Sequence, residues 1–507
     1  MLATIASSVV QGVDGHPVTV EVHVSNGLPS YTLVGLPDAS CRESRDRVRA
    51  AILSSGYRWP ARRVTINLAP SGLRKQGSAL DLPIALGILA ASEQIEAARL
   101  SDLGAIGELG LDGSVRPVPA AVSLADAVAA TDLAVPSGVA EQAAAVRPDS
   151  VLAVDHLRQL LDGLTGVGPL PPMASSPDVS SPAGCPPVGD LAEVRGQPLA
   201  RWALEVAAAG GHHLLMTGPP GAGKTMLASR LVGLLPPLDA AQAVATTRVH
   251  SAAGLPVPPG GLVRLPPFRA PHHGASMVAV VGGGTAAMRP GEVSCAHNGV
   301  LFLDELGEFA APVLDSLRQP LEEGVVRVSR AARSVTLPAR FQLVAAMNPC
   351  PCGFGADPPR CTCNDNARAR YARRLSGPLL DRFDLRLGVR PPATALLMGG
   401  EAEEPTVVVA ERVRTARARA SERGARCNAE LPAPVLEAAA PLSAAASEVL
   451  TNELERGRLT GRGLRRVRAV ALTIADLAGT DGPLTGDTVR AALGLRAEPA
   501  SFLGEAA

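Results

Sequence analysis

The segment from residue 212 to 231, HHLLMTGPPGAGKTMLASRL, is the sequence feature that most constrains the fold of this chain. Its apolar start predicts a strand, and the leucines at helical spacing after the glycines predict a helix. Between them stands G-x-x-x-x-G-K-[ST], whose glycines let backbone N–H groups close around a phosphate. The alternative is a plain glycine/proline turn. The predicted phosphate-binding loop consists of Gly218, Pro219, Pro220, Gly221, Ala222, Gly223, Lys224 and Thr225.

Lysine usage favours the phosphate-binding interpretation. Of 48 basic residues only Lys75 and Lys224 are lysines, and one of the two stands in this loop, where the planar fork of arginine would not fit. Lys224 is expected to reach the β- and γ-phosphate oxygens, and Thr225 to ligate Mg²⁺. The helix that follows would add its positive dipole end.

Two more apolar stretches end in polar residues. Residues 299–303 (GVLFL) lead into Asp304 and Glu305, a pattern typical of a buried parallel strand. Asp304 is predicted to hold Mg²⁺ through water and Glu305 to polarise the attacking water. The alternative is a strand that ends in two solvated acids. Residues 341–347 (FQLVAAM) lead into Asn348, which would orient the lytic water; otherwise it is a strand-ending turn residue.

Composition sets the broad class. The 507 residues carry 48 acidic and 48 basic side chains, so the net charge is zero and the simplest argument for nucleic-acid binding is missing. The length predicts more than one domain, and the composition excludes a collagen-like, coiled-coil or wholly disordered chain. We expect a cytoplasmic protein without a signal peptide or membrane helix, because the longest uncharged run, 270–288, has the glycines and histidines of a loop.

The chain divides by composition. Residues 1–165 alternate Val/Ile/Leu strands with Ala-rich helices such as 39–56 and 79–92, which predicts an α/β or α+β domain. The Pro/Ser/Gly-rich stretch 166–188 is a predicted linker, and 189–392 alternates strands and helices again. After a boundary at AEEP (402–405), residues 406–507 have a helical period with breaks at Pro432, Pro434, Pro441 and Pro483.

These motifs, together with several longer segments, resemble the ComM/YifB branch of the magnesium-chelatase subunit I-like AAA+ ATPases. The resemblance extends over nearly the whole chain except the linker and the last dozen residues. It implies an α/β protein with a Lon-protease/S5-like α+β N-terminal domain, an AAA+ P-loop domain with a parallel sheet, and a C-terminal helical lid. The segments are NLAPSGLRKQGSALDLPIALGIL (67–89), FRAPHHGAS (268–276), PGEVSCAHNGVLFLDEL (290–306), NPCPCGF (348–354), SGPLLDRFD (376–384) and TGRGLRRVR (460–468).

The resemblance also implies roles for two arginines. Arg382 matches the arginine finger, which enters a neighbouring subunit's ATP site, and Arg462 matches the sensor-2 arginine of the helical lid. Both imply a ring, expected to be a homo-hexamer. For Arg462 the alternative is a solvated charge in an arginine-rich helix.

The family implies work on DNA. Residues 324–336 resemble the hairpin that helicase relatives point into a central pore, where Arg327, Arg330 and Arg333 would contact phosphates; the alternative is a solvated hairpin tip. Residues 360–390 contain eight arginines and three aspartates, a locally basic stretch. The expected function is ATP-driven translocation on single-stranded or branched DNA, as in a ComM-like branch-migration helicase of recombination and natural transformation. The alternative is a chelatase-like motor that remodels a protein partner.

Two features remain open. Cys350, Cys352, Cys361 and Cys363 could form a tetrahedral zinc site, although C-x-C pairs are tighter than the usual spacing; reduced surface thiols and an iron–sulfur cluster are the alternatives. Ser78 falls where Lon-type proteases carry their nucleophile, but 119–122 (PAAV) replaces the downstream lysine that they need. We therefore expect no protease activity and assign Ser78 to a turn or helix cap.

Overall fold

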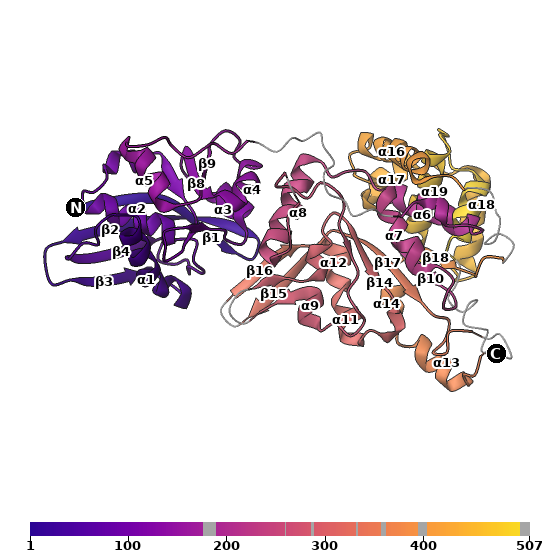
Figure 1. The fold of residues 1–507 in the computed structure, drawn as a ribbon. Helices are drawn as coiled ribbons and strands as arrows, with labels where there is room; N and C mark the ends of the chain where they lie inside the picture. Colours follow the sequence, from indigo (N-terminus) through magenta and orange to yellow (C-terminus); the bar gives the residue numbers. More distant parts are fainter. Residues whose placement is uncertain are drawn as a thin grey trace.

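The computed structural model describes residues 1–175, 189–258, 260–284, 288–330, 333–355, 361–393 and 403–496. Three parts follow one another along the chain: an N-terminal sheet domain, a central parallel sheet with its helices, and a C-terminal group of helices (Figure 1). The prediction of a mixed α/β protein that contains a parallel sheet is confirmed.

The N-terminal part is built on a seven-stranded sheet in the order β3-β4-β2-β1-β5-β8-β9. Antiparallel pairing joins β1 to β2 and β2 to β4, whereas the other neighbours are parallel. The strands are β1 Leu2–Gln11, β2 Asp14–Ser25, β3 Ser30–Val34, β4 Arg63–Ala69, β5 Leu103–Ala105, β8 Asp132–Pro136 and β9 Val151–Val154, with a small ladder of β6 Glu108–Leu109 and β7 Val115–Arg116.

Helices pack on both faces of the central strand β1 because this strand is apolar on both sides. Along β1, Ile5 and Val9 pack with α2, and the alternate residues Ala6 and Val10 pack with α3. Helix α2 is the central one, and all of its residues are buried. The helices are α1 Ala39–Ser54, α2 Asp81–Ala91, α3 Ala121–Ala127, α4 Ala140–Ala144 and α5 Leu157–Thr165, with 3₁₀ turns η1 Ala97–Leu100 and η2 Ser137–Val139.

The central part contains a five-stranded sheet in the order β11-β14-β17-β10-β18, and all its neighbours are parallel. The three apolar stretches singled out in the sequence are its adjacent strands β14, β17 and β10, so the residues that follow them meet at one edge. The strands are β10 Leu214–Thr217, β11 Phe268–Arg269, β14 Val300–Leu303, β17 Gln342–Met347 and β18 Leu385–Gly388.

Helices and short ladders surround this sheet. A separate antiparallel hairpin, β15 Val325–Arg330 with β16 Arg333–Pro338, projects beside it, and β12 Gly282–Gly283 pairs with β13 Arg289–Pro290. The helices are α6 Pro198–Gly210, α7 Lys224–Leu234, α8 Ala240–Ala253, α9 Met277–Val281, α10 Glu292–Cys295, α11 Ala311–Ser316, α12 Arg318–Glu323, α13 Asp365–Ala372 and α14 Gly377–Leu380, with η3 Leu191–Glu193 and η4 Leu306–Glu308.

The C-terminal helices share a hydrophobic core with the central sheet. Buried residues of α16 and α19, such as Val413 and Val470, lie in the same cluster as Leu204 of α6 and Leu227 of α7. Burial of such side chains contributes roughly 1.5–3 kcal/mol each. The helices are α16 Thr406–Glu422, α17 Ala433–Ala439, α18 Ala444–Glu455, α19 Gly461–Leu477 and α20 Gly486–Gly494, with η5 Asn428–Glu430.

The N-terminal part contacts the central part where α3 meets α8 and where the β1–β2 turn meets the β15–β16 hairpin (Figure 1). Arg248 of α8 forms an ion pair with Asp126 at 2.6 Å. Val13, in the turn between β1 and β2, is buried in the same cluster as Val326 and Leu337 of the hairpin. The base of the hairpin is therefore held between two parts of the molecule.

Two local predictions were wrong. The run 270–288 is not all loop, because α9 lies within it and begins after Ser276, whose side chain accepts a hydrogen bond from the backbone N–H of Ala279. Pro434 does not break a helix but stands in the first turn of α17, where proline's missing N–H costs nothing. Over the described stretches of chain, no helix combines the length and apolarity that crossing a membrane requires.

Candidate nucleotide site and a second, arginine-lined cavity

The glycine-rich loop connects β10 to α7 in a conformation that depends on its glycines. Gly221 and Gly223 have φ of +78° and +84°, which side chains rarely adopt. A Cβ on Gly218 would lie 2.1 Å from the carbonyl oxygen of Val389, so only glycine fits there. Helix α7 begins at Lys224, which places its N-terminal N–H groups at the loop.

Lys224 is held inside the loop. Its Nζ donates to the carbonyl oxygens of Gly218 at 2.6 Å and Pro219 at 3.0 Å, and to Oδ1 of Asn348 at 3.2 Å. Burial lowers the pKa of the Lys224 ammonium. The structure thus brings together Lys224 and Asn348, which are 124 residues apart.

Thr225 and Asp304 form the second contact of the site. Asp304 follows β14, and its Oδ2 accepts a hydrogen bond from Oγ1 of Thr225 at 2.7 Å. A hydroxyl and a carboxylate side by side are oxygen donors of the kind that Mg²⁺ takes. With Lys224 and the N-terminus of α7, these residues fit a nucleoside triphosphate with Mg²⁺.

Glu305 lies next to this pair in a strained backbone conformation, with φ of +52°. Its N–H donates to Oδ1 of Asp304 at 2.9 Å, and its carboxylate lies 3.1 Å from Nδ1 of His273. No role for His273 follows from the sequence, although it stands in the family segment 268–276. Its contact with Glu305 could not be read from the sequence because the two belong to different loops.

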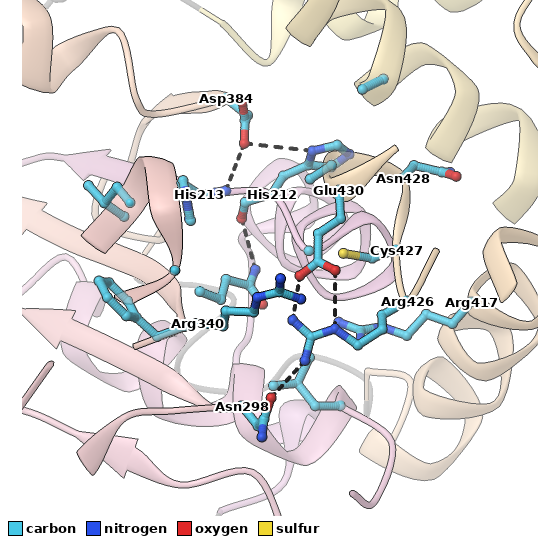
Figure 2. A pocket seen from close by; sticks show the side chains of 18 of the residues that line it. His212, His213, Asn298, Arg340, Asp384, Arg417, Arg426, Cys427, Asn428 and Glu430 are labelled. Atoms are coloured by element: carbon cyan, nitrogen blue, oxygen red, sulfur yellow. Dashed lines mark hydrogen bonds and ion pairs between the residues drawn. The ribbon is translucent and has the colours of Figure 1, made fainter. Parts of the chain in front are cut away.

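A cavity of about 800 Å³ lies at the opposite edge of the sheet (Figure 2). It is lined by residues that precede the strands, including His213 before β10 and Gln342, at the start of β17, and by the C-terminal helices. Asp384 is buried there and accepts hydrogen bonds from the backbone N–H of His213 at 3.0 Å and from Arg466 at 3.1 Å. Burial alone would raise the pKa of Asp384, but His212 and Arg466 hold it well below its usual range.

Arg382 and Arg462 both line this cavity. The guanidinium of Arg382 is buried and forms an ion pair with Glu322, a partner that was not predicted from the sequence. Arg462 is exposed in the first turn of α19. The structure therefore brings the two arginines to one cavity and separates them from the phosphate-binding loop by the length of β10, about 13 Å.

The β15–β16 hairpin carries the three arginines predicted to contact DNA. Its strands pair from Val325 with Pro338 to Arg330 with Arg333, as predicted. Arg327 is exposed, and a nitrogen of its guanidinium lies 2.5 Å from a carboxylate oxygen of Glu323. The side chains of Arg330 and Arg333 fall outside the described part of the structure, so their role stays a prediction.

The four cysteines after Asn348 converge. Their sulfur atoms all lie within 4.8 Å of one another, in the loop that follows β17. A backbone N–H of Phe354 that points at Cys352 lowers the pKa of this thiol to about 6. The group could hold a metal ion.

In the N-terminal part, Ser78 and Lys75 have partners that are not those of a protease dyad. The hydroxyl of Ser78 donates to the carboxylate of Glu108, and Nζ of the buried Lys75 donates to the carbonyl oxygen of Pro70. Ser78 lies in a turn, as predicted, but does not cap α2, whose N-cap is Leu80.

A phosphate-binding loop between a strand and a helix of a parallel sheet, with an acidic pair and an asparagine after the neighbouring strands, defines a P-loop ATPase of the AAA+ class. Comparison with protein families gives three matches. The model for magnesium chelatase, subunit ChlI, matches residues 190–396; that for subunit ChlI of Mg-chelatase matches 20–137; and that for the ChlI C-terminal region matches 403–496.

Full-length relatives define the branch. The chain is 44% identical to the uncharacterized protein YifB of Salmonella typhimurium over 481 residues, 94% of this chain and 93% of that protein. It is 43% identical to competence protein ComM of Haemophilus influenzae over 483 residues, 94% of each chain. The magnesium-chelatase 67 kDa subunit of Heliobacterium mobile is 29% identical over 186 residues, 31% of this chain and 28% of that protein. The chain belongs to the ComM/YifB family of magnesium-chelatase-like ATPases.

Proposed function

We propose that the chain hydrolyses ATP at the phosphate-binding loop. Lys224 and the loop N–H groups bind the β- and γ-phosphates. The phosphate oxygens then replace the loop carbonyl oxygens as partners of Nζ. Thr225 and Asp304 would hold Mg²⁺, which would neutralise phosphate charge when bound. Glu305 takes the proton of the attacking water, and Asn348, bonded to Lys224, orients that water at the γ-phosphate.

The observation that carries the mechanism is the placement of Arg382 and Arg462 in one cavity at the far edge of the sheet. Neither arginine can reach the loop of its own chain across β10. We infer that both act on the loop of a neighbour that lies against that edge, where a guanidinium stabilises the charge that develops during phosphoryl transfer. A head-to-tail contact of this kind generates a ring when the rotation between neighbours closes. We therefore propose a homo-hexameric ring in which the C-terminal helices act as a lid contributing Arg462 to the neighbour's site.

The work that we propose for this ring is translocation on single-stranded or branched DNA, as in a branch-migration helicase. Two features support DNA as the substrate: the arginine-bearing β15–β16 hairpin, and 43% identity to a protein named for competence. The hairpin arginines would contact phosphates, which are the same for every sequence, so binding would show little sequence preference.

A second candidate is a motor that remodels a protein partner, as the family descriptions and the similarity to a magnesium-chelatase subunit suggest. The two candidates share the ATP site and the ring. They differ in the ligand that stimulates hydrolysis.

Steady-state ATPase assays distinguish them. We expect hydrolysis by the wild-type protein to rise severalfold on addition of single-stranded or branched DNA, and Lys224→Ala to abolish both basal and stimulated rates. ATP hydrolysis that rises on addition of a protein fraction but not on addition of DNA would support the remodelling motor. The absence of ATP hydrolysis under every condition would contradict the proposal as a whole.

A further inference from the structure

The four-cysteine loop has the sulfur spacing of a single tetrahedral ion. Cys350 Sγ lies 3.2 Å from that of Cys352 and 3.8 Å from that of Cys361, and the Cys352 and Cys361 sulfurs are 3.6 Å apart. Zinc–thiolate bonds of 2.3 Å in a tetrahedron put the sulfurs about 3.8 Å apart. A disulfide would bring one pair to about 2.05 Å and leave two thiols over. In a four-iron cluster each thiolate binds a different iron, which spreads the sulfurs farther apart.

The backbone around the cluster is arranged for thiolates. The N–H of Gly355 donates to Sγ of Cys350 at 3.2 Å, and Cys350 is fully buried. Such N–H groups stabilise charge on ligand sulfurs and fix their direction. Isolated thiols are weak hydrogen-bonding groups and give no reason for four of them to converge. The other described cysteines, Cys41, Cys295 and Cys427, are buried and take no part in the cluster.

The same loop packs on the nucleotide site. Cys350 follows Asn348 by two residues, and Asn348 accepts the hydrogen bond from Lys224. Gly353 lies against the phosphate-binding loop so closely that a Cβ there would come within 2.6 Å of Cδ of Pro220. A rigid cysteine loop would therefore hold Asn348 and Pro220 in place together.

We propose that Cys350, Cys352, Cys361 and Cys363 bind one zinc ion, and that this ion fixes the loop which supports Asn348 and the phosphate-binding loop. The proposed zinc binding is independent of activity. The proposed supporting role of the ion rests on the ATP binding proposed above. When the ion is removed, the loop loses its crosslink and the phosphate site its support.

The metal itself is tested on the full chain. Elemental analysis of protein purified without chelators should give one zinc per chain. After zinc is removed with a thiol-directed mercurial and the thiols are regenerated, Co²⁺ should bind with the intense visible absorption of tetrahedral thiolate coordination. Cys361→Ser and Cys352→Ser should lose the zinc and the cobalt spectrum, whereas the matched controls Cys41→Ala and Cys295→Ala should keep both.

Zinc-free wild-type protein that gives no cobalt–thiolate spectrum would overturn the site, even if the serine variants failed to fold. A coloured protein with one iron per chain would identify the ion as iron and contradict zinc. The link to the nucleotide is measured by binding of a fluorescent ATP analogue to zinc-loaded and zinc-depleted protein. We expect affinity about tenfold weaker without zinc, equivalent to about 1.4 kcal/mol.

Equal affinity in the two forms would contradict the supporting role while leaving the metal site in place. No nucleotide binding in either form, with the cobalt spectrum intact, would count against the proposed ATPase and not against the zinc.

Discussion

Glu305 is the residue at which local strain and proposed chemistry coincide. Its φ of +52° is costly for a residue with a side chain, and its carboxylate is turned toward His273 beside the Thr225–Asp304 pair. Glu305→Gln keeps the size and the backbone conformation but removes the base. We expect the variant to bind ATP normally and to hydrolyse it about 10²–10⁴ times more slowly, as measured by single-turnover kinetics.

Glu308→Gln is the matched control for this variant. Glu308 is exposed three residues further on and forms an ion pair with Arg374 at 2.8 Å. An exposed ion pair contributes little to the stability of the fold, so this variant should hydrolyse ATP at nearly the wild-type rate. If Glu305→Gln also turned over normally, Glu305 would not be the base.

At the scale of elements, the β15–β16 hairpin is the test of DNA contact. Changing Arg327, Arg330 and Arg333 together to glutamine should weaken binding of single-stranded DNA. If each arginine neutralises one phosphate, the slope of log affinity against log salt should fall by about 2. Basal ATP hydrolysis should not change, because the hairpin lies outside the phosphate site.

The control is an equal loss of charge elsewhere. Arg158, Arg414 and Arg490 are about as exposed as Arg327 and lie far from the hairpin along the chain. Their change to glutamine should leave the salt slope unaltered. The same fall in slope for both triple variants would mean that overall charge, not the hairpin, binds DNA.

The elements differ in how far the sequence determined them. Strands β10, β14 and β17 were predicted because buried parallel strands are continuous apolar runs and each ends on a polar residue. The predicted helices 39–56 and 79–92, expected from their alanine-rich composition, correspond to α1 and α2. Helix α9 was missed because it has five residues in a glycine-rich run and depends on one serine cap.

The contacts of the site were less visible. Lys224, Thr225, Asp304 and Asn348 could be placed together because parallel strands end at one edge. The pairs His273–Glu305 and Glu322–Arg382 join loops and helices whose approach is set by tertiary packing. No periodicity or spacing in the sequence encodes them, and only their presence in family-like segments marks some of these residues.

At the scale of the whole molecule, the separation of the two arginines from the phosphate loop makes the assembly testable. Arg382→Ala alone should bind ATP but hydrolyse it about 10³ times more slowly or worse. Its phosphate loop is intact, whereas a Lys224→Ala chain has a defective loop but an intact Arg382. In a mixed ring, the intact phosphate-binding loop of an Arg382→Ala chain forms a complete site when its neighbour is a Lys224→Ala chain, which supplies an intact Arg382. At equal mixing this holds for about one interface in four.

We therefore expect a 1:1 mixture of Arg382→Ala and Lys224→Ala, dissociated and reassembled together, to recover about a quarter of the wild-type rate per chain. The control is a mixture of Lys224→Ala with Glu305→Gln. Both changes damage the loop side of the site, so no interface in that mixture is complete. The rate of ATP hydrolysis should therefore equal the sum of the rates that the two parent variants contribute separately. If the first mixture also gave only that sum, Arg382 would not act on a neighbour, and the cavity at the far edge of the sheet would need another explanation.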